Sequence, residues 1–258
     1  MLKDLLYRLY ERRLLAETRR GPVPHHLGLI QDGHRRYARE AGLADLSEGY
    51  RRGAATTEEV LTWCGELGIP LVTLWWLSTE NLGRQPEDLR AVIAVIETTM
   101  TEWMRRRLPE RLGMRIYPFG TLELLPQSLV ETLKSTEAAT RHLDRMRLNV
   151  GVGYGGRQEI LDAFMGYLGD CFMRGDAAEE ILEGLGPDVL EKYLYTSDCP
   201  DPDLIIRTSG EVRLSGFMLW QSAYSEFYFC DAYWPAFRKI DFLRAIRSFQ
   251  QRRRRFGK

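Results

Sequence analysis

The sequence predicts a single α/β domain with a central, mainly parallel sheet of six strands flanked by helices. Short apolar runs alternate with longer amphipathic segments along most of the chain, and strands joined by helices form parallel sheets. The chain has 258 residues, 44% of them hydrophobic, which suffices for one sizeable core. Since no linker, repeat or low-complexity segment interrupts the pattern, we expect one domain over residues 1–258.

Apolar runs bounded by polar segments predict the strands, beginning with "HLGLIQ". These runs span residues 26–31, 71–76, 114–120, 147–153, 203–209 and 226–231. Helical periodicity covers residues 51–68, 86–108, 125–143 and 156–172, then a short helical pair, then a terminal helix at 241–257. Pro86 suits the first turn of the second helix. Because parallel sheets are buried on both sides, we expect helices on both faces.

The N-terminal segment, residues 2–18, predicts an amphipathic helix. Leu2, Leu5, Leu6, Leu9 and Leu14 recur at helical spacing. Charges interrupt every apolar run, so the segment does not read as a signal peptide, and no stretch approaches the roughly 18 apolar residues of a membrane span. The helix could dock on this chain, on a partner subunit or on a membrane surface, and docking on protein is favoured.

Charge and cysteine content exclude several classes of protein. Lysine plus arginine equals aspartate plus glutamate, at 36 each, which argues against general nucleic-acid binding. The four cysteines, Cys64, Cys171, Cys199 and Cys230, form no CxxC pair with metal-ligand spacing. We therefore expect reduced thiols and a cytoplasmic protein.

Polar clusters follow the predicted strands, at the edge of the sheet where such proteins bind ligands. The first cluster is Asp32, Gly33, His34, Arg35 and Arg36. Gly33 would let the backbone approach an anion at a helix start, and Asp32 could hold Mg²⁺ shared with phosphate. The alternative is that Asp32 is a plain helix N-cap, and spacing alone does not decide between the two.

The second cluster lies after the second strand, in "WWLSTENLGR". Ser78, Asn81 and Arg84 supply hydroxyl, amide and guanidinium groups that suit a polar head group. Trp75 and Trp76 precede them, and strand alternation places these two rings on opposite faces.

A third cluster, "GVGYGGRQEI", contains GxGxxG through Gly151, Gly153 and Gly156. This motif supports an alternative, a nucleotide-binding protein. The signal is weak, because a dinucleotide fingerprint usually opens the first strand–helix–strand unit and this one follows three strands. The glycines would equally permit tight packing.

The fourth cluster, around the last two strands, is the most informative. Arg207, Arg213 and Ser215 lie close together in sequence, and arginine forks match diphosphate oxygens. Glu226 begins an aromatic strand, where a carboxylate is awkward unless it holds a metal or a cation. Asp32 and Glu226 could therefore flank one Mg²⁺. Several arginines, two possible metal carboxylates and apolar residues near the strand ends together suit a substrate with a diphosphate head and an apolar tail.

These motifs resemble those of the cis-prenyltransferases, the family that includes undecaprenyl diphosphate synthase. The resemblance runs from about residue 25 to 257, through "DGHRRYA", "LSTENL", "YGGRQEI", "DLIIRTSGEVRLSGFMLWQSAYSEFYF" and "WPAF" in the family's order. "STENL", "EGYRRGA" and the N-terminal helix are more similar to the short-chain, Z-farnesyl-type branch. The resemblance implies a cytosolic homodimer and Mg²⁺-dependent coupling of two isoprenoid diphosphates.

By position, the resemblance assigns the first motif to the allylic substrate. Asp32 would grip metal and the allylic diphosphate, while the Gly33 backbone and Arg36 would hold that leaving group. Arg35 and Tyr37 belong to the same motif and are expected to bind substrate.

The resemblance assigns the later motifs to the second, five-carbon diphosphate. Arg207, Arg213 and Ser215 would hold it, and Glu226 would complete the metal site. The residues implied between the two sites are Ser78, Asn81 and Arg84, with Ser78 and Asn81 counted as catalytic. The tail "RRRRFGK" is similar to the family's terminal RxG motif, which reaches toward the partner subunit's site and points to Arg255 and Gly257.

Three departures from the family pattern keep a second reaction open. The motif asparagine is His34 here, its tryptophan is Tyr37, and the residue before the second arginine is Val212. Relatives that couple two units irregularly, in lavandulyl-type head-to-middle joining, also lack that asparagine. A histidine with an ordinary pKa near 6.5 is a competent base, so His34 is a candidate catalytic residue and both couplings stay open.

The expected product is short, about three isoprene units or fewer (C10–C15). Trp76 stands two residues before Ser78, on the strand that should line the tail channel, and its indole would fill volume that a long chain needs. A non-catalytic partner subunit is another alternative, but such a protein would be expected to lose metal or arginine positions that this chain keeps.

Overall fold

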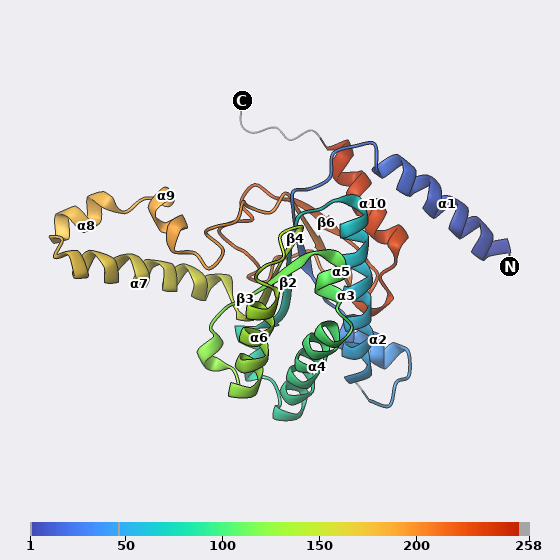
Figure 1. Ribbon diagram of the computed structural model, residues 1–258, viewed down its shortest axis with the longest axis horizontal. Coiled ribbons are helices and arrows are strands. Elements are labelled where there is room, and N and C mark those ends of the chain that lie inside the picture. Colours follow the sequence, from blue (N-terminus) through green and yellow to red (C-terminus); the bar gives the residue numbers. More distant parts are fainter. Residues whose placement is uncertain (1, 46, 253–258) are drawn as a thin grey trace.

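The centre of the molecule is a six-stranded sheet in which all five pairings are parallel. The computed structural model describes residues 2–45 and 47–252, with side chains from residue 6 onward (Figure 1). The strands lie in the order β3-β4-β2-β1-β5-β6. Their bounds are β1 His26–Ile30, β2 Leu71–Ser78, β3 Met114–Phe119, β4 Met146–Tyr154, β5 Leu204–Arg207 and β6 Glu226–Phe229. The predicted strands and the α/β class are confirmed.

The helices follow the predicted alternation, with shifted ends. Their bounds are α1 Leu2–Thr18, α2 His34–Glu40, α3 Ser47–Leu67, α4 Pro86–Arg105, α5 Leu108–Leu112, α6 Gln127–Thr140, α7 Gly156–Arg174, α8 Ala178–Gly184, α9 Pro187–Leu190 and α10 Lys239–Gln251. Short 3-10 turns are η1 Thr79–Gly83, η2 Leu122–Leu124, η3 Glu191–Tyr193 and η4 Trp234–Ala236. The predicted helix at 86–108 is interrupted because Arg107 adopts a left-handed conformation, at φ 54°.

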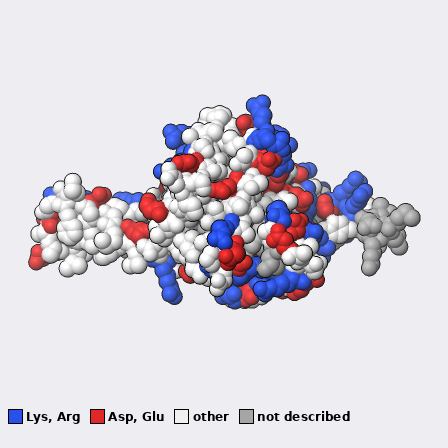
Figure 2. All heavy atoms as spheres, turned by 90° about the horizontal axis from the view of Figure 1, so that it is seen from below, with Lys and Arg blue, Asp and Glu red and all other residues white. Residues whose placement is uncertain are grey.

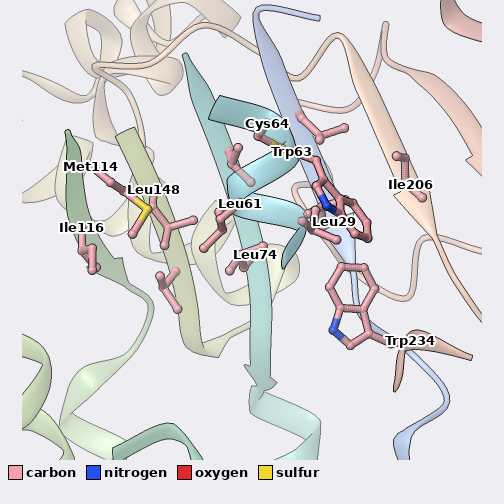
Figure 3. Close-up of a cluster of buried hydrophobic side chains, with 14 of the residues drawn as sticks. Leu29, Leu61, Trp63, Cys64, Leu74, Met114, Ile116, Leu148, Ile206 and Trp234 are labelled. Carbon is pink, nitrogen blue, oxygen red and sulfur yellow. The ribbon is translucent and has the colours of Figure 1, made fainter. Parts of the chain in front are cut away.

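One face of the sheet carries the main hydrophobic core, under α3, α4, α6 and α10. Figure 3 shows Leu29, Leu74 and Leu148 of three strands on the face that α3 covers. Trp63 of α3 also meets Phe242 of α10, with ring centroids 5.8 Å apart. This packing fixes the position of α3 and α4 above the strand ends.

The other face is covered mainly by irregular chain between β5 and β6. Phe217 and Met218 from this segment are fully buried against Ile30 and Ile205. Gly28 makes room for them, since a Cβ there would lie 2.9 Å from the Phe217 ring. Helix α7 instead leaves the body with α8 and α9 as an extended arm (Figure 1). The sheet is flanked by helices and covered on both faces, as predicted, although irregular chain makes up most of the cover on this second face.

Helix α1 packs along α10, in agreement with docking on protein. Leu14 is buried, and the Gln250 amide donates to the Thr18 carbonyl at 2.8 Å. Leu6 and Leu9 stay exposed on the outer side. Within the described residues, no helix combines the length and the apolar character needed to span a bilayer.

Candidate active site

A cavity of about 760 Å³ opens at the carboxyl ends of β1, β2 and β5. Helices α2, α3 and α4 complete its walls. Its charged lining is Arg35, Arg36, Arg39, Arg84, Arg207, Arg213, Asp32, Glu80 and Glu211. Six arginines against three carboxylates favour an anionic ligand.

Asp32 lies just beyond β1 and holds two arginines. Its Oδ2 accepts from Arg207 Nη2 at 3.0 Å, and its Oδ1 accepts from Arg36 Nη2 at 3.1 Å and from the Gly33 N–H at 2.7 Å. Burial by itself would raise the pKa of Asp32, but the hydrogen bond and charge of Arg207, with the charge of Arg36, leave that pKa below its ordinary value. Asp32 is ionised at neutral pH, and the N-cap of α2 is Gly33 instead of Asp32.

Arg207 ends β5 and is the most buried cation of the cavity, with 3% of its surface exposed. Nη1 donates to Ser215 Oγ at 2.8 Å and to the Arg213 carbonyl. Its Nε is buried without a hydrogen-bond partner in the described chain. A buried donor without a partner is costly, so this group is ready for an anion or water.

Arg36, Arg213 and Glu211 form the outer part of the charged lining. Arg36 donates to Glu211 at 2.8 Å and to Ser209 Oγ at 2.8 Å. Arg213 pairs with the same Glu211 and donates from Nε to Ser215 Oγ at 3.2 Å. These arginines are linked by carboxylates of their own chain, and Arg213 remains 58% exposed.

His34 is half-buried against α3. Its ring stacks on Tyr50, with centroids 5.3 Å apart and planes inclined by 27°. Gly53 makes room for the ring, because a Cβ there would lie 2.3 Å from Nε2. Burial lowers the pKa of His34 to about 4, against the opposing charge of Asp32 and with the help of Arg84. The imidazole is neutral at pH 7 but a weak base.

The predicted loop residues Ser78, Asn81 and Arg84 reach the cavity. Ser78 Oγ accepts from the Asn81 N–H at 3.1 Å and so fixes the turn η1. Arg84 donates to the Tyr50 hydroxyl at 3.3 Å. Arg35 lines the same rim and donates to Asp88 at 3.3 Å.

The two tryptophans of β2 lie on opposite faces of the sheet, as the alternation predicts. Trp75 stacks on Phe217, with centroids 5.6 Å apart, whereas Trp76 meets Trp103 of α4 at 5.6 Å. Both reach the cavity because it lies at the end of this strand. The apolar lining beside Trp76 comes from α4 residues Val92, Val95 and Ile96, followed by Thr99.

Three predicted residues are not placed in the site by the described part of the chain. Tyr37 lies outside the cavity lining and accepts a hydrogen bond from Arg52 at 2.7 Å, because it is about 200° around α2 from Arg35. Arg255 lies outside the described residues, as does Gly257. The third residue is Glu226.

Glu226 begins β6, whereas Asp32 follows the end of β1. The register places Glu226 level with Leu204 and Leu27, so it is about 16 Å from the level of Asp32 along the strands. Its carboxylate pairs with Arg252 at 2.6 Å. Asp32 and Glu226 of one chain are therefore too far apart to flank one Mg²⁺, and a metal role for Glu226 stays a prediction.

The glycines of GxGxxG do not line the cavity. A Cβ on Gly156 would lie 2.6 Å from the Gly216 carbonyl, and one on Gly153 would lie 3.2 Å from the Thr121 carbonyl. These contacts favour the packing interpretation over the nucleotide site.

Sequence reasoning missed several lining residues. Glu211 stands between Arg207 and Arg213, so its place in the arginine cluster was a usable signal. Tyr50 and the α4 residues gave no local signal, because only the packing of α3 and α4 on the sheet brings them to the cavity.

Comparison with known proteins agrees with this geometry. The prenyltransferase family model, described as undecaprenyl diphosphate synthase, matches residues 30–257. The (2Z,6E)-farnesyl diphosphate synthases of Thermobifida fusca and Mycolicibacterium smegmatis are 52% and 46% identical over 100% of this chain, covering 99% and 97% of those proteins.

A solved structure supports the same assignment. Lavandulyl diphosphate synthase from Lavandula x intermedia, in complex with dimethylallyl diphosphate, superposes with a TM-score of 0.85 at 29% identity, covering 92% of this chain and 99% of that one. The chain therefore belongs to the undecaprenyl diphosphate synthase family and is a prenyltransferase.

Proposed function

We propose that the protein is a short-chain cis-prenyltransferase that joins an allylic isoprenoid diphosphate to isopentenyl diphosphate, releasing diphosphate and giving a product of about C10–C15. The observation that carries the proposal is the two-part cavity, arginine-lined at one end and bounded by Trp76 and α4 at the other. Such a cavity matches a molecule with a diphosphate head and a short apolar tail. The full-length relatives named (2Z,6E)-farnesyl diphosphate synthase support C15 as the product.

We propose that Mg²⁺ assists the reaction and that Asp32 is its protein ligand. Among the described residues, no group of three His, Cys, Asp or Glu side chains forms a ready metal cage. Mg²⁺ fits this site nonetheless, because it is often held by one or two carboxylates and by substrate phosphate oxygens. When bound, the ion would neutralise charge on the diphosphate. Glu226 could serve as a metal ligand only at the site of another copy of the chain.

The chemistry assigns distinct tasks to the cavity residues. As the allylic carbon–oxygen bond breaks, negative charge grows on the departing diphosphate, and Arg36 can donate N–H groups to it. Arg207, expected at the second diphosphate, bonds both Asp32 and Ser215 and could donate to either diphosphate. Arg213 and Ser215 would hold the diphosphate of the second substrate. The double bond of that substrate's isopentenyl group forms the new carbon–carbon bond before a proton leaves. Holding both substrates in one cavity gives the order that the coupling needs.

Regular coupling is favoured over the irregular alternative. That alternative used His34 as a base near pH 7, but burial lowers its pKa to about 4, far from the optimum for a general base. The two relatives named for regular (2Z,6E)-farnesyl products are 46–52% identical, whereas the lavandulyl diphosphate synthase is 29% identical.

We also propose that the enzyme works as a homodimer through the α7 arm. Leu161, Met165 and Phe172 lie on one side of α7 and are 58%, 64% and 68% exposed. Figure 2 shows the arm at the left, with few charged side chains on the face in view. An exposed apolar stripe of this kind fits a protein interface.

The four free thiols, two of them buried, suit a reducing compartment. We therefore propose that the enzyme works in the cytoplasm.

The direct test is product analysis with defined substrates. Geranyl diphosphate, with labelled isopentenyl diphosphate and Mg²⁺, should give a C15 product with one new cis double bond. Chelation of Mg²⁺ should stop turnover, and dimethylallyl diphosphate alone should give no product. Formation of a branched C10 product from dimethylallyl diphosphate alone would overturn the regular reaction.

A further inference from the structure

The segment between β5 and β6 contains three residues in an unfavourable backbone conformation, and one of them, Ser215, lines the cavity. Ser209, Ser215 and Met218 have φ values of 78°, 52° and 45°, in the left-handed region that residues with side chains rarely adopt. Such a conformation persists only where its surroundings hold it in place. The turn that contains Ser215 and Met218, residues 215–218, begins two residues after Arg213.

A buried tyrosine holds this turn. The Tyr154 hydroxyl, at the end of β4, accepts the Met218 N–H at 3.1 Å. The Gly156 N–H donates to the Gly216 carbonyl at 2.8 Å, so one bond from the end of β4 and one from the start of α7 hold the turn. Trp75 adds a third link, since its indole N–H donates to the Tyr154 carbonyl at 3.1 Å while its ring stacks on Phe217.

A buried carboxylate lies behind that tyrosine. Glu159, in the first turn of α7, is 1% exposed, and its Oε2 accepts from the Tyr154 hydroxyl at 2.6 Å. Its Oε1 accepts from the Gln221 amide at 3.0 Å and from the Tyr195 N–H at 3.1 Å. Burial raises the pKa of Glu159, although these three hydrogen bonds act in the opposite direction. These three donors are all neutral groups: a hydroxyl, a backbone N–H and a side-chain amide.

The direction of the hydrogen bonds gives this carboxylate a specific task. The Tyr154 hydroxyl donates to Glu159, and its lone pairs then face the Met218 N–H. An amide in the place of Glu159 could itself donate to Tyr154, and the hydroxyl proton would lose its defined acceptor.

We propose that Glu159 is a positioning residue, which acts through Tyr154 to hold the 215–218 turn and thereby places Ser215 and Arg213 for the second diphosphate. The link to the cavity is short, because Ser215 Oγ accepts from both Arg207 and Arg213. The assignment of that diphosphate to the five-carbon substrate rests on the proposed function. Glu159 itself does not line the cavity.

The test compares Glu159→Gln and Tyr154→Phe with the control Tyr195→Phe. The control removes the Tyr195 hydroxyl, which bonds Asp162, and keeps the backbone N–H that bonds Glu159. The first readout is amide hydrogen exchange of residues 215–218 without substrate, which should be faster in both test variants, by about tenfold for one lost buried hydrogen bond, and unchanged in the control.

The second readout separates positioning from general destabilisation. KM for isopentenyl diphosphate should rise about tenfold in Glu159→Gln, while kcat and KM for the allylic diphosphate change less than about threefold. Uniformly faster exchange with a lower kcat and both KM values raised would show a merely structural role and overturn the proposal. So would wild-type exchange and KM in Glu159→Gln.

A third readout keeps the proposal testable if the protein does not couple isoprenoid diphosphates. Calorimetric titration of the wild-type protein and Glu159→Gln with inorganic diphosphate measures the anion site alone. Weaker binding in the variant, with faster exchange at 215–218, would support the positioning role even if product analysis failed. Equal binding and equal exchange would overturn it whatever the product.

Discussion

The two ends of the sheet carry similar side chains in opposite circumstances. At the amino ends, His26 is fully buried, with Nδ1 2.7 Å from the Pro200 carbonyl and Nε2 2.7 Å from Thr73 Oγ1. At the carboxyl ends, His34 stacks on Tyr50 beside an open cavity that is lined by six arginines and three carboxylates. Burial lowers the pKa of both histidines to about 4.

At these two places the completeness of hydrogen bonding, more than the type of residue, separates a structural group from a functional one. Elsewhere in the described chain Arg115 Nε, Thr121 Oγ1 and Gln221 Oε1 are also buried without a partner, outside the cavity. The amino-end His26 has a partner for each ring nitrogen, whereas the carboxyl-end Arg207 has a buried Nε without one. Fully partnered groups hold the fold, and partly partnered groups are available to a ligand. The following predictions test this division, from the largest expected effect to the smallest.

Replacing Asp32 with asparagine should lower kcat by about a hundred- to a thousandfold, because the variant removes the proposed metal ligand and keeps its shape. Asp203→Asn is the matched change at the amino ends, where Asp203 accepts from the His25 and His26 N–H groups. That control should lower stability and leave kcat near the wild-type value. Normal Mg²⁺-dependent turnover of Asp32→Asn would contradict the division.

Replacing His26 with alanine should lower the free energy of unfolding by about 2 kcal/mol, since two buried hydrogen bonds disappear. Urea denaturation measures the loss, and kcat of the folded variant should be unchanged. A variant as stable as the wild type would show that these bonds contribute little.

The same histidine predicts a pH dependence of stability. Its pKa is about 4 in the folded chain and ordinarily about 6.5, so the unfolded chain binds more protons between these values. Stability should be full above pH 6.5 and should fall by about 1.4 kcal/mol per pH unit for each such histidine as the pH drops toward 4. Between pH 6.5 and pH 5 the free energy of unfolding should fall less in His26→Ala than in the wild type. An equal fall in both proteins would refute the assignment to His26.

Replacing Trp76 with alanine should lengthen the product beyond three isoprene units, because the indole bounds the apolar end of the cavity. Trp103→Ala should shift the products in the same direction but less, since Trp103 supports Trp76 from behind. Chromatography of the dephosphorylated products measures both shifts. An unchanged distribution in Trp76→Ala would place the length limit elsewhere.

Replacing His34 with asparagine should change kcat less than about threefold and leave the activity profile from pH 5.5 to 8 unaltered. With a pKa of about 4, His34 does not titrate in this range. This outcome reverses the expectation drawn from the sequence, in which an ordinary pKa made His34 a base. Loss of an acid limb, or a change from branched to linear product, would restore that role.

The sequence contained most of the fold because strands and helices depend on local patterns. Asp32 and Arg207 could be paired from the sequence, since the carboxyl ends of neighbouring parallel strands meet at one edge. Glu226 was misplaced because the same rule puts a residue that begins a strand at the opposite edge. The path of residues 208–225 and the reach of α4 depend on contacts between distant segments, which no local pattern reveals.

The carboxylates that form ion pairs with the cavity arginines also make it harder for an anion to bind there. Arg36 and Arg213 are both joined to Glu211, and Arg36 and Arg207 to Asp32. An incoming anion must therefore compete with these internal partners before it gains a guanidinium. A diphosphate offers enough charge and enough oxygen atoms to compete at several arginines at once, whereas inorganic phosphate and sulfate offer fewer. The enzyme without substrate thus discriminates against small anions at its charged lining, before the apolar tail of the substrate contributes to binding.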